Sequence, residues 1–298
     1  MRSAIIIPAY NAAGTLRETL ESVQENSGLE DYVDQVIVGD DASEDDTVKQ
    51  AKEAWSSETP IRIRRNEANE GERTTVNGAI KSVEEEFNWI FILHADDLVK
   101  EHWLSSMVEV MEQAPDGVAS VCSSYDELHE PEGRIDPGEN DHSREVEHIS
   151  GNLESVRDSL KRGCWWHLSG CAIRVDALSH IGLFDPTLPH VGDWDWMLRC
   201  LAEGYAIRYL PRTLTYYRRH EGTVSADSFR LDRDLKEKLR VLRRYQSYLS
   251  TTDWLKIHAR TLEYVVRRIG RSALNQNWSS VRDRTSFATR VVRSALLR

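Results

Sequence analysis

The chain has 298 residues, of which 40% are hydrophobic and 29% charged, and its formal net charge at pH 7 is −11. This composition is typical of a globular protein with a buried core, and no apolar run approaches the ~20 residues that a membrane-spanning helix needs. Nucleic acid is excluded as the main partner, because phosphate backbones are bound by clustered Lys and Arg. The start of the chain lacks the pattern of a signal peptide, so the expected location is the cytoplasm.

The charge is divided unevenly along the chain. From residue 230 onward there are 17 Lys and Arg against 6 Asp and Glu, a net charge of +11, which leaves −22 for residues 1–229. The acidic part would repel a diphosphate unless a metal ion intervened. Four cysteines are too few and too scattered for a disulfide framework or a zinc site, so reduced, buried thiols are expected at Cys122, Cys164, Cys171 and Cys200.

Strands and helices alternate over residues 1–124, which predicts an α/β sheet. Short apolar runs indicate strands at 5–7, 36–38, 61–64, 90–93 and 118–122. Apolar residues at spacings of three and four predict helices near 16–23, 48–55, 76–83 and 104–111.

The alternation stops between residues 126 and 147, where acids dominate and apolar residues are few. We expect a long loop there, and the sequence leaves open whether residues 126–148 form a lid or are disordered. Beyond it the pattern predicts helices near 153–160 and 194–203 and strands near 207–210 and 214–217.

The basic part after residue 230 is expected to be helical. One apolar stripe with alternating spacings of four and three is expected to be buried against the sheet domain; it consists of Leu255, Ala259, Leu262, Val266 and Ile269. The alternative for these helices is a peripheral contact with an anionic membrane or an acidic protein.

Polar residues follow three of the predicted strands. Asp40 and Asp41 follow one strand, Asp96 and Asp97 another, and the first strand ends in the segment 8–11. Side chains at the carboxyl ends of parallel strands converge on one crevice. Adjacent carboxylates repel each other, and a hard divalent cation between them and an anionic ligand relieves the repulsion. The alternative is that each acid caps the helix that follows, which explains any one of these positions alone.

Six segments in the same order also carry a family resemblance: 5–11, 36–43, 69–77, 94–97, 192–195 and 217–220. Over residues 3–220 the chain resembles the family 2 glycosyltransferases, inverting enzymes of the GT-A fold that use nucleotide-diphosphate sugars. His94-Ala95-Asp96-Asp97 falls at the metal-binding D-x-D of that family, and Gly192-Asp193-Trp194-Asp195 falls at its E-D motif. Two positions depart from the family pattern, because His94 replaces the first Asp and Gly192 replaces the Glu.

The resemblance implies a Rossmann-like GT-A domain, with a mixed, mostly parallel sheet flanked by helices, over residues 1–228. Residues 1–124 would bind the sugar nucleotide, residues 150–228 would supply the acceptor site and the base, and residues 229–298 would form a basic helical extension. The nucleotide-binding residues implied by position are Pro8, Ala9, Tyr10, Asn11, Asp40, Asp41, Gly71, Asn77 and Asp96.

The same resemblance implies the catalytic groups. Asp96, with Asp97 and His220, would hold Mn²⁺ or Mg²⁺ against the diphosphate, and Asp193 would take the proton of the acceptor hydroxyl. The structural alternative for Asp193 is a helix N-cap, and for His220 a surface histidine. The role of His94 stays open.

Aromatic side chains cluster around the expected base. Aromatic faces stack against sugar rings, so an acceptor site is expected at Trp165, Trp166, Trp194 and Asp195, although core packing is the alternative for each tryptophan and capping for Asp195.

The sequence therefore predicts an inverting, metal-dependent glycosyltransferase that moves a sugar, with UDP as the expected carrier, to a saccharide or lipid-linked acceptor. The alternative is a sugar-nucleotide-binding scaffold without turnover, which the altered motif positions motivate. A nucleotidyltransferase is disfavoured, because we find no glycine-rich basic loop for a triphosphate.

Overall fold

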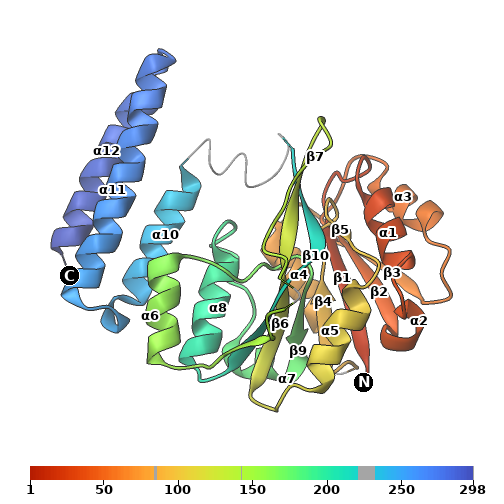
Figure 1. Ribbon diagram of the computed structural model, residues 1–298. Helices are drawn as coiled ribbons and strands as arrows, with labels where there is room; N and C mark the ends of the chain where they lie inside the picture. Colours follow the sequence, from red (N-terminus) through yellow and green to blue (C-terminus); the bar gives the residue numbers. More distant parts are fainter. Residues whose placement is uncertain (84–85, 142, 221–231, 298) are drawn as a thin grey trace.

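A single ten-stranded sheet forms the centre of the computed structural model, which describes residues 1–83, 86–141, 143–220 and 232–297 (Figure 1). The strand order is β3-β2-β1-β4-β9-β6-β10-β5, with β7 paired to β6 and β8 to β10. The strands are β1 (Ser3–Ala9), β2 (Gln35–Asp40), β3 (Ile61–Arg65), β4 (Trp89–Ile92), β5 (Leu98–Val99), β6 (Val118–His129), β7 (Arg134–Asp136), β8 (Glu147–Ile149), β9 (Cys171–Arg174) and β10 (Ala206–Arg219).

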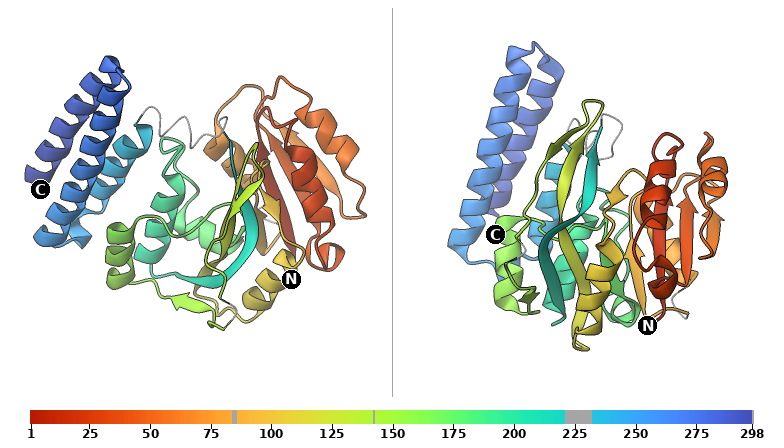
Figure 2. Two further views of the ribbon diagram at one scale, coloured as in Figure 1. Left: turned by 45° about the horizontal axis from the view of Figure 1, so that its top comes forward. Right: turned by 45° about the vertical axis from the view of Figure 1, so that its right-hand side comes forward.

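Helices cover both faces of this sheet (Figure 2). Their bounds are α1 (Leu16–Gln24), α2 (Leu29–Tyr32), α3 (Thr47–Ala54), α4 (Glu72–Lys81), α5 (Trp103–Glu112), α6 (Leu153–Arg162), α7 (Val175–Ile181), α8 (Gly192–Ala202), α10 (Arg233–Arg244), α11 (Thr251–Leu274) and α12 (Trp278–Leu296). On β1, Ile5 and Ile7 face the core under α1, α3 and α5, whereas Ala4 and Ile6 face the core under α4. Burial on both faces explains why the strand sequence is continuously apolar.

The predicted fold class is confirmed. β1, β2, β3 and β4 pair in parallel, and β6 pairs in parallel with β10, while β9 joins the two halves through antiparallel ladders. The two strands predicted near 207–210 and 214–217 are one strand, β10, with irregular register near Leu210. The sheet is therefore mixed, with most paired residues in the parallel ladders.

The expectation of a loop over residues 126–147 was wrong at residues 126–129, 134–136 and 147, which lie in strands, whereas the other described residues of that segment lie outside strands and helices. β6 continues to His129 and turns into β7, and β8 adds to the outer side of β10. Polar contacts hold this region: the Asp126 carboxylate lies 2.6 Å from the Lys100 ammonium, and the His129 ring lies 3.0 Å from Asp136 across the hairpin. Strands held by such contacts lack the apolar alternation on which the prediction depends.

The three C-terminal helices lie on the side of the molecule remote from β3, with α10 next to α6 and α8 and with α11 and α12 beyond it (Figure 1). The predicted buried stripe on α11 was wrong, because Leu255 and Val266 are 47% and 55% exposed. The buried face of α11 carries Trp254, Ile257, His258, Thr261 and Val265 instead. Hydrogen bonds from the His258 ring to the Trp254 carbonyl and the Ser294 hydroxyl make a polar residue acceptable there.

In the described part of the chain, each helix is too short or too polar to cross a bilayer. The predicted boundary between residues 228 and 229 lies outside the described residues. All four cysteines are free thiols, as expected; Cys122, Cys171 and Cys200 are buried, whereas Cys164 is exposed.

Candidate active site

A cleft of about 690 Å³ opens at the carboxyl ends of β1, β2 and β4. Several predicted site residues from distant parts of the chain line it together: Pro8, Ala9, Tyr10, Asn11, Asp41, Gly71, Asp96, Trp165, Trp166, Asp193 and His220. This convergence is the geometry expected for strand ends in an open α/β sheet.

Of the first acidic pair, only Asp41 lines the cleft. Its carboxylate accepts hydrogen bonds from the backbone N–H groups of Glu70 and Gly71, at 2.9 and 2.8 Å, and from the Asn66 amide. Asp40 is fully buried behind it and lies 3.2 Å from Arg65. Asp41 therefore fixes the loop before α4, and its position at the cleft makes it the member of the pair that a nucleotide would meet.

Gly71 shapes the entry to α4. Its φ of +87° is a conformation that side chains with a Cβ rarely adopt, so glycine suits this turn. Asn77, also predicted to bind nucleotide, lies outside the cleft lining. Its amide exchanges two hydrogen bonds with the backbone of Phe184, at 2.8 and 3.0 Å, and ties α4 to the segment before α8.

The second acidic pair also divides. Asp96 lines the cleft, and its carboxylate lies 3.3 Å from Nε2 of His220. Asp97 is buried, with one carboxylate oxygen accepting the backbone N–H of Arg218 at 2.9 Å. Burial, together with the charge of Asp96, raises the pKa of Asp97 to about 7.

His94, whose role the sequence left open, belongs to an ion-pair cluster. Its Nε2 lies 3.2 Å from the Glu72 carboxylate and its Nδ1 3.7 Å from Asp97. Burial opposes the charged ring, but these carboxylates outweigh it and raise the pKa of His94 to about 9. For Glu72, burial is outweighed by Arg73 and His94, which lower the pKa of its carboxyl to about 2.

A divalent metal ion fits this end of the cleft. Ligand atoms of His94, Asp96 and Asp97 lie within 4.8 Å of one another, and the second carboxylate oxygen of Asp97 has no hydrogen-bond partner among the described residues. Carboxylate oxygens are the ligands that Mg²⁺ and Mn²⁺ favour. His94, Asp96 and Asp97 supply the donor atoms of this cluster, and His220 lies at its edge, 3.3 Å from the Asp96 carboxylate.

Asp193 lies in the first turn of α8 and lines the same cleft. Its side chain is 23% exposed, accepts the backbone N–H of Trp194 at 2.8 Å, and lies 4.0 Å from the Arg73 guanidinium.

The residues predicted for the acceptor divide between the cleft and the core. Trp165 is half-buried and lines the cleft. Trp166 borders the cleft but is 1% exposed, and its ring stacks on Trp196 at 5.0 Å in the core. Trp194 and Asp195 are 3% and 0% exposed and lie behind the cleft lining. Asp195 is held by Arg199 and Arg244, which gives it structural contacts in place of the expected acceptor contact.

Several lining residues were missed by the sequence analysis. Arg73 and His190 lie beside Asp193, and Tyr125, His167 and Arg219 line the same cleft. The sequence contained a weak indication that Arg73 belongs to the site, since Arg73 lies in the segment 69–77 that carries the family resemblance. Arg219 lies in the segment 217–220 that carries the family resemblance, whereas Tyr125, His167 and His190 had no signal in the sequence, because the fold brings them to the cleft from separate segments.

Solved structures with the same fold are similar to this chain. A mannosyltransferase from Pyrobaculum calidifontis, solved with GDP-Man and Mn²⁺, has a TM-score of 0.62 at 15% identity, covering 99% of this chain and 86% of that one. TarS 1–349 from S. aureus, solved with UDP-GlcNAc, has a TM-score of 0.61 at 15% identity, covering 95% and 90%. GalNAc-T7, solved with UDP, GalNAc and Mn²⁺, has a TM-score of 0.60 at 16% identity, covering 82% and 48%.

Sequence comparisons give the family. No curated protein matches the chain. The model of glycosyl transferase family 2 matches residues 4–153, and that of glycosyl transferase family group 2 matches residues 89–293. Together with the GT-A-like fold and the cleft at its strand ends, these matches show that the chain belongs to the family 2 glycosyltransferases.

Proposed function

We propose that this glycosyltransferase is an inverting, metal-dependent enzyme that transfers a hexose from a nucleotide-diphosphate sugar to a saccharide or lipid-linked acceptor. The observation that carries the proposal is that Asp96 and Asp193, 97 positions apart, line one cleft. One carboxylate lies at the strand ends and the other at the start of a helix. That arrangement supplies separate groups for the leaving diphosphate and for the acceptor.

Donor binding is assigned to the side of the cleft formed by β1, β2 and β4. Asp41 and the backbone at 8–11 would contact the base and ribose, and Asp96, Asp97 and His220 would hold Mn²⁺ or Mg²⁺. When bound, such an ion neutralises charge on the departing diphosphate. Arg219, which also lines the cleft, adds a fixed positive charge on the same side.

Asp193 would act as the base. Its carboxylate would accept the proton of the acceptor hydroxyl as that oxygen attacks the anomeric carbon. Attack from the face opposite the leaving group inverts the configuration. Trp165 would stack on the acceptor ring, because it lines the cleft on the side of α8.

UDP is the proposed carrier, supported by similar structures solved with UDP-GlcNAc or with UDP and GalNAc; the mannosyltransferase solved with GDP-Man makes GDP the second choice. A donor panel of UDP- and GDP-sugars, with and without Mn²⁺, tests the proposal through release of the nucleoside diphosphate and the anomeric configuration of the product. Metal-linked nucleotide binding without transfer or hydrolysis would favour the alternative, a non-catalytic sugar-nucleotide-binding scaffold.

The exposed surface of α11 and α12 supports a second proposal, contact with an anionic membrane surface from the cytoplasmic side. Its exposed apolar side chains are Leu255, Tyr264, Val266, Leu274, Trp278, Val292, Leu296 and Leu297. The net charge of +11 from residue 230 onward favours anionic lipid and disfavours a second copy of the same basic helices. Such a contact would bring the enzyme to a lipid-linked acceptor.

A further inference from the structure

One face of α10 contacts the segment that leads into α8. A carboxylate oxygen of Glu237 accepts the backbone N–H groups of His190 and Val191, at 2.9 and 3.1 Å. Arg240 donates to the carbonyl and the hydroxyl of Thr187, both at 2.9 Å. These contacts join residues about 50 positions apart and involve the backbone of the segment directly.

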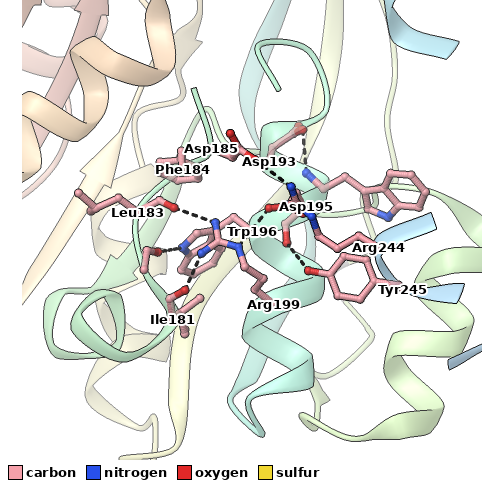
Figure 3. Close-up of polar contacts among 12 residues, drawn as sticks. Ile181, Leu183, Phe184, Asp185, Asp193, Asp195, Trp196, Arg199, Arg244 and Tyr245 are labelled. Carbon is pink, nitrogen blue, oxygen red and sulfur yellow. Dashed lines mark hydrogen bonds and ion pairs between the residues drawn. The ribbon is translucent and has the colours of Figure 1, made fainter. Parts of the chain in front are cut away.

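Arg244 completes this set of contacts (Figure 3). Its guanidinium lies 3.0 Å from the Asp185 carboxylate and 2.6 Å from that of Asp195. Glu237, Arg240 and Arg244 are spaced by three and four residues, which places them on one face of the helix. We call these three residues the α10 clamp.

The segment held by the α10 clamp forms one wall of the cleft. Pro189, His190 and Asp193 all line the cleft, and they lie between the two carboxylates, Asp185 and Asp195, that Arg244 bridges. The backbone of Asp193 is thus fixed on both sides by contacts from outside its own helix.

Asp195 is the buried centre of the arrangement. Its carboxylate is shared between Arg199 of its own helix and Arg244 of α10, and its carbonyl accepts the Tyr245 hydroxyl at 3.4 Å. Arg199 in turn donates to the carbonyls of Ile181 and Leu183, at 2.5 and 2.7 Å (Figure 3). A fully buried carboxylate needs cationic partners. Loss of one arginine would leave the Asp195 carboxylate partly uncompensated and would disturb the turn of α8 to which Asp195 belongs.

We infer that Glu237 and Arg244 are positioning residues for the base Asp193, so that the C-terminal helical extension is part of the acceptor half of the active site. The inference rests on the proposed function of Asp193. Among the described residues, the hydrogen bonds and ion pairs of the clamp reach the segment before α8 and α8 itself, and not the donor-side residues on β1, β2 and β4. Loss of the clamp therefore slows transfer and leaves nucleotide binding intact.

Three variants and one matched control test this inference in the full-length protein. Arg244→Ala removes both ion pairs, Arg244→Lys keeps the charge without the two-pronged geometry, and Glu237→Gln removes one charge at nearly constant shape. Arg243→Ala is the control, because Arg243 donates to Ser294 of α12 and belongs to the same helix. We expect kcat to fall at least 10-fold in Arg244→Ala, with partial recovery in Arg244→Lys and no change in Arg243→Ala.

Two further measurements separate positioning from general damage. The dissociation constant for UDP or GDP with Mn²⁺, whichever stabilises the wild type, is expected to change less than twofold. Hydrogen exchange in peptides over residues 185–198 is expected to rise in Arg244→Ala and Glu237→Gln but not in Arg243→Ala. If Arg244→Ala unfolds, Glu237→Gln carries the test.

Unchanged exchange over residues 185–198, or wild-type kcat in Arg244→Ala, overturns the inference. A failure of the proposed function has a different signature. In that case the wild type itself transfers no sugar from any donor, while the exchange of residues 185–198 still responds to Arg244→Ala.

Discussion

The carboxylate of Asp96 lies 3.3 Å from Nε2 of His220, although 124 residues separate them in the sequence. Asp96 follows β4, and His220 follows β10, two strands that β9 and β6 separate in the sheet. Arg218 bridges the two strand ends, since its side chain donates to the Asp96 carbonyl at 2.6 Å and its backbone N–H to Asp97. The acidic motif and the end of β10 therefore form one unit at the cleft.

Replacing Asp96 by alanine is expected to lower turnover about 10³-fold. The reason is that the proposed metal would stabilise the negative charge on the departing diphosphate in the transition state by several kcal/mol. The same change should abolish the effect of Mn²⁺ on nucleotide binding. At ~100 times its dissociation constant, a ligand adds about 2.7 kcal/mol of stability, which thermal denaturation with UDP or GDP detects. Asp116→Ala is the control, since Asp116 is a surface acid remote from the cleft lining. Wild-type turnover in Asp96→Ala would disprove the metal role.

Replacing Asp193 by asparagine is expected to lower kcat by about 10² to 10⁴, because the hydroxyl then attacks without a base. Nucleotide affinity should stay near the wild-type value, since the donor side is untouched. Asp176→Asn is a matched control, an exposed acid in the first turn of α7. Equal losses of kcat and nucleotide binding would instead indicate that Asp193 only supports the fold.

Apolar periodicity predicted the central strands well for a physical reason. β1, β2 and β4 are buried on both faces, so their sequences are continuously apolar and end abruptly in polar residues. The β6–β7 hairpin was missed because polar contacts, such as that of His129 with Asp136, take the place of apolar contacts there. Apolar periodicity predicts which strands are buried, but it does not predict strands that are held by polar contacts with their neighbours.

Within the candidate site, the sequence identified acidic pairs but not which member reaches the cleft. Neighbouring residues at a strand end point to opposite sides, and here Asp41 lines the cleft while Asp40 is buried. Asp193 and Asp195 differ in the same way, because their place on α8 sends one to the cleft and the other to Arg244. The contacts of the α10 clamp could not be predicted from the sequence, because the residues that it contacts lie about 50 positions away along the chain.

Acidification is expected to destabilise the protein through His167. Burial lowers the pKa of His167 to about 3, so its ring stays neutral in the folded protein at pH 5. The unfolded chain takes up that proton below its ordinary pKa of ~6.5, so the stabilising contribution is present above pH 6.5 and falls as the pH drops. The expected loss is about 2 kcal/mol at pH 5, measured by urea unfolding.

The difference between wild type and His167→Gln isolates this contribution from other titrating groups. His167→Gln should lose about 2 kcal/mol less than the wild type between pH 7.5 and pH 5. His180→Gln is the control, because His180 is an exposed histidine on α7. Identical pH dependence in wild type and His167→Gln would contradict the burial of a neutral ring.

The proposed membrane contact predicts binding to vesicles that contain anionic lipid and weak binding to neutral vesicles. Trp278 and Leu274, at the turn between α11 and α12, are 66% and 84% exposed. Their joint replacement by serine should reduce cosedimentation with anionic vesicles severalfold, because both apolar burial and charge attraction are needed for stable binding.

Ile135→Ser is the control, since Ile135 is 49% exposed on β7. Equal binding to neutral and anionic vesicles would contradict the role of charge. Self-association in solution that the serine variant abolishes would identify a second copy as the partner instead.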